Sequence, residues 1–440
     1  MSPTFQTPQS GPLTTRTDED LAPGDIAVGV IIGRASEYFD FFVFGIASVL
    51  VFPQVFFPFV DPLTGTLYAF LVFALAFIVR PVGTLIGMEI QRKFGRSAKL
   101  TVALFLLGCS TVGMGLLPGY SSAGATAILL LALCRVGQGL ALGGSWDGLP
   151  SLLALNAPPN RRGWYAMLGQ LGAPLGFFVA SGVFLYVYTS TEASDFLTWG
   201  WRFPFFTAFA INVVALFARL RLVVTHEYEK RMEEHELDPA YLHELLPAQG
   251  HHIVIGAFAA LASYALFHLV TVFPLSWVAL FAHGDVADFM KMELLGAAFA
   301  AVAMPMSGVI ADRIGRRNFL GMLAAAIGVF ALFAPLMLGG GKPGQAAFIL
   351  IGFVLLGLSY GQSAGSVTSN FLPHFRYTGA ALTADMAWLL GAAFAPVVAL
   401  FLSSRFGLVS LSVYLLSGVV CTLVALRVNK RLRVAPVVQD

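Results

Sequence analysis

Three ionisable residues, Arg34, Glu37 and Asp40, stand inside an apolar run that extends from Ile26 to Phe52. A charge at the centre of a bilayer costs roughly 2.5 to 3.5 kcal/mol even on insertion scales, so a spanning helix keeps such residues for a reason. Their spacing of three places all of them on one stripe of a helix. Two interpretations follow: a structural ion pair between Arg34 and Glu37, or a pathway for a solute and protons. The rarity of charges inside membranes favours the pathway.

A fourth charge, Arg135, lies near the middle of another apolar run. Its planar guanidinium suits a carboxylate better than a lysine would, because it donates two parallel hydrogen bonds. Arg135 is therefore predicted to bind a substrate carboxylate, or to be the partner that Asp40 and Glu37 release when they bind a proton. A purely structural pairing of Arg135 with these acids stays open. For proton coupling, a buried acid must alternate between a cation and a proton; Asp40, the deeper acid, is the first candidate and Glu37 the second.

Other polar side chains within apolar runs are candidates for the lining of a solute cavity. Each alone is equally well explained by a hydrogen bond between helices, worth about 0.6 kcal/mol in a membrane. His268 is of interest because a free imidazole titrates near neutral pH, although a buried histidine with satisfied nitrogens is the commoner case. Asp385 has no assigned role. Together with Arg135, the predicted substrate-binding residues are Gln138, Tyr38, Gln170, Gln362 and His268.

The elements that must position these residues are membrane-spanning helices. The chain of 440 residues is 57% hydrophobic and only 11% charged, with a mean hydropathy of +0.79, whereas soluble proteins carry about 25 per cent charged residues. A helix crosses the hydrocarbon with about 20 apolar residues, and twelve such runs predict an all-α membrane protein of twelve helices. Their limits are 26–50, 66–90, 98–118, 124–151, 163–189, 200–224, 252–281, 288–311, 318–338, 346–370, 378–402 and 407–428.

Basic residues are distributed unevenly between the loops. Loops after the even-numbered runs contain most of them, whereas the opposite loops hold Arg202, Lys291, Lys342 and Arg405. Because positive residues accumulate on the cytoplasmic side, both termini are predicted to be cytoplasmic. The basic set includes Arg92, Lys93, Arg96, Lys99, Arg161, Arg162, Arg313, Arg316, Arg317, Arg376 and Arg427.

A polar stretch at residues 225–250 divides the apolar runs six and six. It is expected to form a central cytoplasmic loop with a solvated amphipathic helix along the membrane face. The predicted organisation is a flexible cytoplasmic tail (1–24), a six-helix bundle (25–224), the central loop, a second six-helix bundle (251–428) and a C-terminal tail (429–440).

The two halves share landmarks in the same order. The stretch 93–96 (Lys-Phe-Gly-Arg) is echoed by 314–317 (Ile-Gly-Arg-Arg), 159–163 by 373–379, and 172–176 by 391–396, at an offset of about 220 residues. Two parallel six-helix repeats are typical of alternating-access transporters, whose site lies between the halves near the midplane. The sequence thus predicts a solute site at the interface of the two bundles.

Five motifs follow one another along the chain: Glu-Tyr-Phe-Asp-Phe-Phe at 37–42, Arg-Pro-Val-Gly at 80–83, Arg-Val-Gly-Gln-Gly at 135–139 with glycines at 143 and 144, Trp-Gly-Trp-Arg-Phe-Pro-Phe at 199–205, and Arg-Tyr-Thr-Gly-Ala at 376–380. In these the chain, over about residues 25–430, resembles the major facilitator superfamily. Within it the resemblance is to bacterial metabolite:proton symporters, which include citrate, 2-oxoglutarate, shikimate and proline/betaine permeases. The resemblance implies proton symport of a small organic acid or zwitterion across a bacterial cytoplasmic (inner) membrane.

The resemblance also implies a gate, in which an acid in the loop after the second helix of each half holds a neighbouring helix end. Two positions depart from the family pattern. Arg92 replaces the acid of the first half, so the gate contact is expected only at Asp312. Ser145 replaces the usual glutamate after the double glycine, which leaves the first-helix acids to carry proton coupling. The gating residues expected from the resemblance are Gly83, Gly95, Arg96, Asp312, Gly315, Arg316 and Arg317.

Other function classes find little support in the sequence. The three cysteines lie in apolar runs without metal or disulfide spacing, and no phosphate-binding loop points to ATP. A Gly-x-Ser-x-Gly spelling at 361–365 lies in an apolar helical run rather than at a strand-to-helix turn. We therefore expect no enzyme activity, cofactor, metal or nucleic-acid partner, and a monomer in the lipid bilayer. A uniporter or exchanger, which Ser145 favours, and a non-transporting solute receptor stay open, and the sequence does not name the solute.

Overall fold

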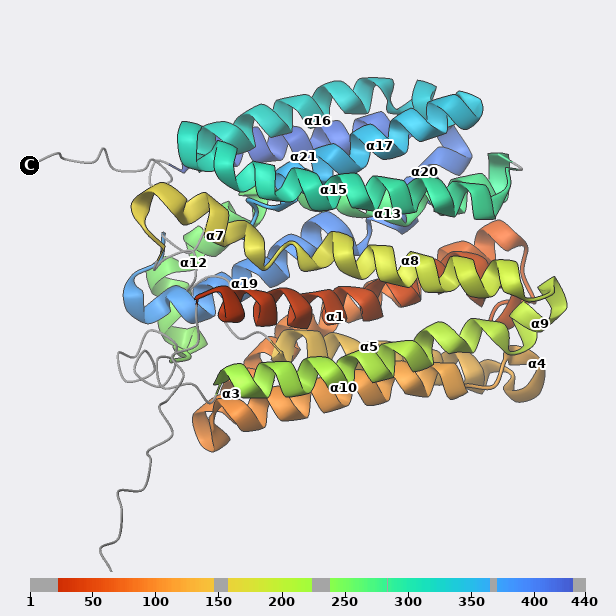
Figure 1. Ribbon diagram of the computed structural model, residues 1–440, viewed down its shortest axis with the longest axis horizontal. Coiled ribbons are helices and arrows are strands. Elements are labelled where there is room, and N and C mark those ends of the chain that lie inside the picture. The colour runs from red at the N-terminus through yellow and green to blue at the C-terminus, as the bar shows by residue number, and fades with distance from the viewer. Residues whose placement is uncertain (1–22, 146–156, 224–237, 283, 365–369, 430–440) are drawn as a thin grey trace, which may run out of the picture.

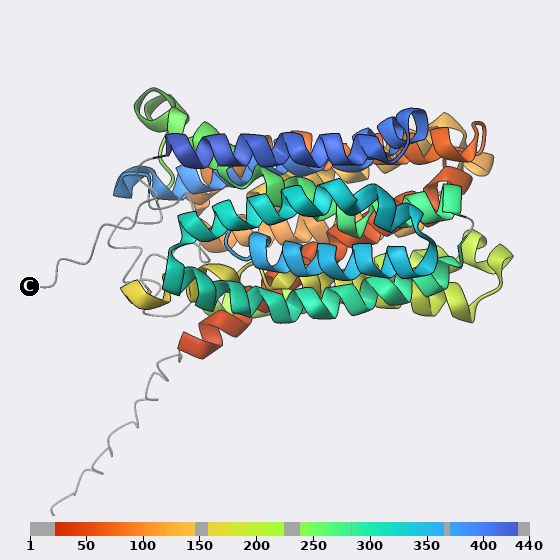
Figure 2. The same cartoon turned by 90° about the horizontal axis from the view of Figure 1, so that it is seen from above.

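The computed structural model describes residues 23–145, 157–223, 238–282, 284–364 and 370–429. Nearly all of these residues are helical, because a chain in hydrocarbon must satisfy its backbone hydrogen bonds within each segment. The long helices run side by side along one axis of the molecule (Figure 1). The view from above shows the same alignment (Figure 2).

The first half is built from long helices joined by short ones. The long helices are α1 (Pro23–Leu50), α3 (Pro62–Leu116), α5 (Ala125–Gly144), α8 (Gly172–Ser190) and α10 (Phe203–Val223). The short ones are α2 (Phe52–Val55), α4 (Tyr120–Ala123), α7 (Arg162–Leu168) and α9 (Ala193–Thr198).

The second half repeats this plan with more interruptions. Its helices are α12 (Leu242–Ala259), α13 (Leu261–Thr271), α14 (Phe273–Trp277), α15 (Val286–Ile314), α16 (Arg316–Gly339), α17 (Gly341–Tyr360), α19 (Arg376–Ala387), α20 (Ala395–Phe406) and α21 (Val409–Val428). A π-helical turn, Trp388–Ala393, joins α19 to α20.

Ten helices of the described residues are long and apolar enough to cross a membrane. One of them, α3, contains two of the predicted spans, and α1, which carries four charged residues, accounts for one more. The ten helices match ten of the twelve apolar runs. The second span of α3 and helix α1 match the other two. The predicted all-α, twelve-helix membrane fold is confirmed.

A glycine with positive φ bends the chain at the same place in each half. Gly95 (φ 82°) interrupts α3, and Gly315 (φ 83°) separates α15 from α16. Residues with a Cβ are strained at such angles, so glycine is required there. The second and third predicted spans therefore meet at the non-helical Gly95, and the sequence repeat is also a repeat of backbone conformation.

The stretch expected to be the central loop contains a helix where the structure describes it. Helix α12 begins at Leu242, inside the stretch 225–250, for which a loop with an amphipathic helix was expected. Glu244 in the first turn of α12 suggested a solvent-exposed segment. The neighbouring Leu245 is nevertheless fully buried. Residues 224–237, where most of the charges of the predicted loop lie, fall outside the described residues.

Helices α3 and α5 pack with their backbones in contact. A Cβ atom at Gly83 would overlap the backbone of Leu140, and a Cβ atom at Gly143 would overlap the backbone of Arg80. Small residues allow such close approach between membrane helices. The contact fixes Arg80 and the end of α5 beside α1.

The two ends of the bundle differ in charge. The basic end, named for the arginines of its loops, contains the Gly95 bend, α7, α12 and the beginning of α1 (Figure 1). The far end contains α4 and α9. Helix α21 ends at the basic end (Figure 2), so the first and last described helices have their outer termini at the same end.

Candidate functional site

A narrow cavity lies between the two halves. Its volume of about 30 Å³ holds about two to three water molecules at about 10 to 15 Å³ each. A metabolite therefore needs the halves to move apart before it can bind. The first half contributes Arg34, Gly169 and Gln170, and the second half contributes Gly256, Ala260, Tyr264, Tyr360, Ser363, Ala364, Ala380, Thr383, Ala384, Ala387 and Trp388.

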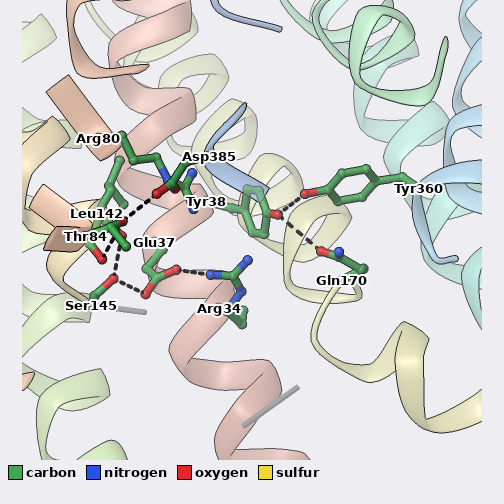
Figure 3. A network of polar contacts seen from close by, with 11 residues as sticks. Arg34, Glu37, Tyr38, Arg80, Thr84, Leu142, Ser145, Gln170, Tyr360 and Asp385 are labelled. Atoms are coloured by element: carbon green, nitrogen blue, oxygen red, sulfur yellow. Dashed lines mark hydrogen bonds and ion pairs between the residues drawn. The ribbon is translucent and has the colours of Figure 1, made fainter. Parts of the chain in front are cut away.

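The charged stripe of α1 provides the cation at this cavity. Arg34 Nη1 lies 2.6 Å from Glu37 Oε2, one helical turn away. Ser145 at the end of α5 donates a hydrogen bond of 2.8 Å to Glu37 Oε1 (Figure 3). The residue that departs from the family pattern thus contacts a first-helix acid directly.

A second buried ion pair crosses from one half to the other. Arg80 on α3 lies 2.8 Å from Asp385 on α19, and Thr84 donates a hydrogen bond of 2.5 Å to the other carboxylate oxygen (Figure 3). The guanidinium of Arg80 also stands 5.8 Å from the ring of Trp388, which lines the cavity. The sequence placed Arg80 in a motif and Asp385 among unassigned polar residues, but nothing in it linked two positions 305 residues apart.

Asp40, the first candidate for proton coupling, lies inside the first half. Asn212 on α10 donates a hydrogen bond of 2.6 Å to Asp40 Oδ2, and the carboxylate is 1% exposed. Asp40 is not among the residues that line the central cavity. Of the two first-helix acids, Glu37 is the one bonded to a cavity residue.

Arg135 is enclosed by its own half. Its Nε and Nη2 both donate to the carbonyl oxygen of Phe73 at 3.1 Å, and Nη1 donates to Gln138 at 2.8 Å. The guanidinium stands 4.1 Å from the ring of Phe44 and 4.7 Å from that of Phe73. Among the described residues no ion pair within 4.0 Å joins Arg135 to Asp40. Backbone and ring contacts, which a sequence does not reveal, thus occupy the donors predicted to meet a carboxylate.

Tyr38 of the first half contacts aromatic residues of the second half that line the cavity. Tyr38 bonds Tyr360 of the second half through their hydroxyl groups and also donates to Gln170 at 3.4 Å (Figure 3). The Tyr38 ring centroid lies 6.2 Å from that of Trp388. Two of the predicted substrate-binding residues, Tyr38 and Gln170, therefore meet at the interface of the halves.

His268, a third predicted substrate-binding residue, lies in an aromatic layer next to this group. Its ring centroid is 5.0 Å from Phe41 and 5.2 Å from Phe73, both of the first half, and 5.1 Å from Phe267. Neither ring nitrogen has a hydrogen-bond partner among the described residues. These aromatic rings pack around His268 at the interface between the halves. His268 itself does not line the cavity.

At the basic end, Asp312 holds the start of α7. Its two carboxylate oxygens accept hydrogen bonds from the backbone N–H groups of Gly163 (2.6 Å) and Trp164 (3.0 Å). Arg316 donates to Gln362 at 3.3 Å, and Gln362 donates to the carbonyl oxygen of Gly163 at 3.1 Å. This cluster, the Asp312 clasp, joins α15 of the second half to α7 of the first. Gln362, predicted to contact the solute, belongs to the clasp and is not among the cavity-lining residues.

The first half makes a different contact at the corresponding place. Lys99 donates to Tyr377 at 2.5 Å and to Gln91 at 3.0 Å, and Tyr377 donates to Gln91 at 2.9 Å. Arg92, which replaces the family acid, pairs with Glu89 at 2.7 Å instead. This Lys99 clasp reaches α19 of the second half. Neutral and basic side chains thus join the halves on this side, whereas a gate contact made by an acid was expected only at Asp312.

The remaining residues of the predicted gate are at or near the basic end. Gly95 and Gly315 form the bends already described, and Arg96 is 3% exposed. Arg317 donates to the carbonyl oxygen of Leu426 at 3.0 Å, which ties α16 to α21 within one half. Gly83 acts in the packing of α3 on α5. Among the described residues, no group of three His, Cys, Asp or Glu side chains is placed to hold a metal ion.

The fold matches solved structures of sugar transporters. A D-xylose-proton symporter superposes with a TM-score of 0.70 at 19% identity, over 91% of this chain and 97% of that chain. The xylose transporter XylE from E. coli in a partially occluded inward open conformation gives a TM-score of 0.70 at 17% identity, over 92% and 97%. At such identities the likeness shows the fold alone.

Sequence comparison identifies the family. Residues 26–237 match the sugar (and other) transporter family. The inner membrane metabolite transport protein YhjE of Escherichia coli is 38% identical over 418 residues, which cover 93% of this chain and 94% of YhjE. The shikimate transporter of the same organism is 29% identical, over 89% of this chain and 91% of that protein. These relatives are transport proteins, which confirms that the chain is not an enzyme: it belongs to the major facilitator superfamily, in the group of metabolite transporters.

Proposed function

We propose that this transporter moves a small organic acid or zwitterion together with protons, by alternating access between its two halves. The observation that carries the proposal is the Arg34–Glu37 ion pair, whose cation lines the central cavity. A solute carboxylate needs a cation in a low-dielectric site, since an unpaired charge there is penalised steeply. Arg34 provides that cation once Glu37 has bound a proton.

The pairing gives a reason for strict coupling. With the cavity empty, Glu37 neutralises Arg34; with a proton on Glu37 and a carboxylate on Arg34, the charges are again balanced. A proton without solute, or solute without a proton, changes the net charge of the site, which is unfavourable in a low-dielectric interior. Only the empty and the doubly loaded site then pass readily between the two sides of the membrane.

Aromatic rings around the cavity support a zwitterionic solute as well as an acid. Tyr264, Tyr360 and Trp388 line the cavity together with Arg34. The faces of such rings attract ammonium and quaternary ammonium groups, at about 0.5 to 2 kcal/mol each. One relative is named a proline/betaine transporter, at 25% identity over 89% of this chain, and another a shikimate transporter. A carboxylate on Arg34 is common to these solute classes.

In the proposed orientation the basic end faces the cytoplasm and both termini are cytoplasmic. Arg92, Arg162 and Arg316 stand at that end, whereas Lys291 and Lys342 belong to the far end. One chain contains both halves and the cavity between them, which supports a monomer as the working unit in the bacterial inner membrane.

A second candidate function is exchange or uniport without protons. Ser145 favours it, because a hydroxyl stands at 2.8 Å from Glu37 where the family carries a further acid. A receptor that binds the solute without moving it is the third. Flux measurements separate all three.

The experiment uses the purified full chain in liposomes with an imposed pH gradient, acid outside. Radiolabelled shikimate, proline and glycine betaine are the probes, and D-xylose is the uncharged comparison. Symport predicts that at least one carboxylate-bearing probe is concentrated inside, up to about tenfold for one proton per solute and one pH unit, whereas D-xylose is not. Equilibration without concentration identifies the exchanger or uniporter, and binding without uptake identifies the receptor.

A further inference from the structure

A fully buried carboxyl group in the second half has no role in the proton and solute steps described above. Glu293 on α15 is 0% exposed, and neither of its oxygens has a hydrogen-bond partner among the described residues. Buried polar groups in folded proteins are almost always bonded. A buried carboxylate without a counter-charge is among the most unfavourable arrangements a membrane protein can hold, whereas the neutral acid is tolerated.

The charged groups near this end of α15 are bonded to one another. Asp288 accepts hydrogen bonds from Lys291 at 3.1 Å and from Lys342 at 3.0 Å. Both lysines are more than half exposed. Lys291, two residues before Glu293, and Lys342, at the start of α17, are therefore both paired with Asp288 at the surface.

The elements packed against α15 bring few other titratable groups. On α17, Tyr360 bonds Tyr38; on α8, Tyr186 is exposed and Tyr188 packs against Phe196. Phe273–Ala282 carries no titratable residue. Those of α7 and α16 are at the basic end: Arg162, Tyr165, Arg316 and Arg317.

Glu293 shares one face of α15 with residues at the interface of the two halves. Ala297, Ala300 and Met304 follow it at steps of four, three and four, and all are buried, as expected for one stripe of a helix. Ala300 and Met304 line a small apolar cavity together with Phe42 and Phe177 of the first half. The carboxyl group thus lies on the stripe that meets the first half, about 10 Å along the helix from its start at the far end.

The first half covers this face through α8. Phe177 of α8 lines the same small cavity as Ala300 and Met304, which share the stripe of Glu293. The Phe177 ring of α8 stands 5.3 Å from Phe353 of α17. In alternating access, opening of the far end separates these helices and admits water to the face that carries Glu293.

We propose that Glu293 is a proton-binding carboxyl group of the transport cycle, neutral while the far end is closed and exchanging its proton with water when the far end opens. In the open state the carboxylate binds one proton from the far-side water, and the resulting neutral acid allows α8 and α15 to close over it. Closure is thereby tied to protonation from the side that supplies protons. This inference rests on the proposed alternating-access function and adds a second protonation site to Glu37.

The first test is infrared difference spectroscopy of the full-length protein in detergent, which needs no solute. The carbonyl stretching band of a protonated, buried carboxylic acid is compared between wild type and Glu293→Gln, with Glu192→Gln as the matched control because Glu192 is exposed at the far end. We expect Glu293→Gln alone to remove one such band near neutral pH. Identical spectra for wild type and Glu293→Gln would overturn the inference.

The second test uses proteoliposomes and the probe solute that the wild type accumulates. Glu293→Gln, a permanent mimic of the neutral acid, is expected to keep solute exchange but to lose most of the accumulation driven by the pH gradient, from about tenfold towards none. Glu293→Asp is expected to restore part of both the band and the accumulation. Full accumulation by Glu293→Gln would refute the inference; absence of accumulation in the wild type itself, with the band present, would refute the proposed symport and leave protonation of Glu293 intact.

Discussion

Arg80 Nε lies 2.8 Å from Asp385 Oδ1, and this ion pair joins α3 of the first half to α19 of the second. The two residues are 7% and 2% exposed, and Thr84 bonds the second carboxylate oxygen. Movement of the halves at this place must separate the pair. Each charge then needs water, a proton or a solute group in exchange, because an uncompensated buried charge is costly. We therefore expect the pair to oppose separation of the halves.

Asp385→Asn leaves the buried guanidinium of Arg80 without its counter-charge. We expect a loss of about 3 to 5 kcal/mol in the free energy of unfolding, seen as a lower melting temperature in detergent. The double variant Arg80→Gln/Asp385→Asn removes both charges and should lose less than the sum of the two single variants. Additive losses would show that the two side chains do not interact.

The Asp312 clasp predicts a change in conformational preference. Asp312→Asn replaces hydrogen bonds to a charged oxygen, each worth about 1.5 to 3 kcal/mol. We therefore expect the equilibrium between the states closed and open at the basic end to shift roughly tenfold to a hundredfold towards the open state. The readout is maleimide labelling of Gln170→Cys at the cavity, with the native cysteines replaced. Asp288→Asn, on the same helix but exposed at the far end, is the control and should leave the labelling rate unchanged. Equal rates for both variants would argue against a gating role for Asp312.

Much of the fold was predictable because the bilayer imposes it. Each crossing needs about 20 apolar residues, so the twelve runs could be read directly from the sequence. The Arg34–Glu37 pair was also accessible, since residues three apart on a helix are neighbours. These features depend on local spacing alone.

What the sequence did not disclose depends on contacts between distant segments. Arg80 and Asp385 are partners across 305 positions, and Arg135 bonds a backbone carbonyl of α3, which no residue type signals. Glu293 follows Asp288 and Lys291 closely, so the stretch looks like a charged loop, yet one helical face buries it completely. A charge beside charges in the sequence need not lie beside them in space.

Ser145→Ala tests the departure from the family pattern. The variant removes the hydroxyl that donates to Glu37 at 2.8 Å, and a carboxylate that loses one donor holds its proton more readily. We expect the pH profile of solute uptake to move to higher pH, with a loss of about 0.5 to 1.5 kcal/mol in stability. Ser145→Thr keeps the hydroxyl and should retain the wild-type profile; the same shift in both variants would assign the effect to packing.

Gly143→Ala tests the backbone contact between α3 and α5. The added methyl group would overlap the backbone of Arg80 and Thr84, and overpacking of this kind costs about 1 to 3 kcal/mol. Gly321→Ala is the matched control, because its nearest neighbour would be Leu426 at 3.9 Å. A lower melting temperature for Gly143→Ala alone is expected, and equal values for the two variants would contradict the close packing.

The most direct test of the account is the accumulation of the accepted probe solute by Glu37→Gln in liposomes, beside wild type and Asp40→Asn. The account predicts that Glu37→Gln still exchanges solute across the membrane but no longer concentrates it under a pH gradient. The reason is that glutamine does not form an ion pair with Arg34, so no proton is needed at position 37 before the solute binds. Asp40→Asn separates the two first-helix acids, since Asp40 bonds Asn212 within the first half and is expected to keep more of the accumulation than Glu37→Gln. Accumulation by Glu37→Gln equal to that of wild type would contradict the account.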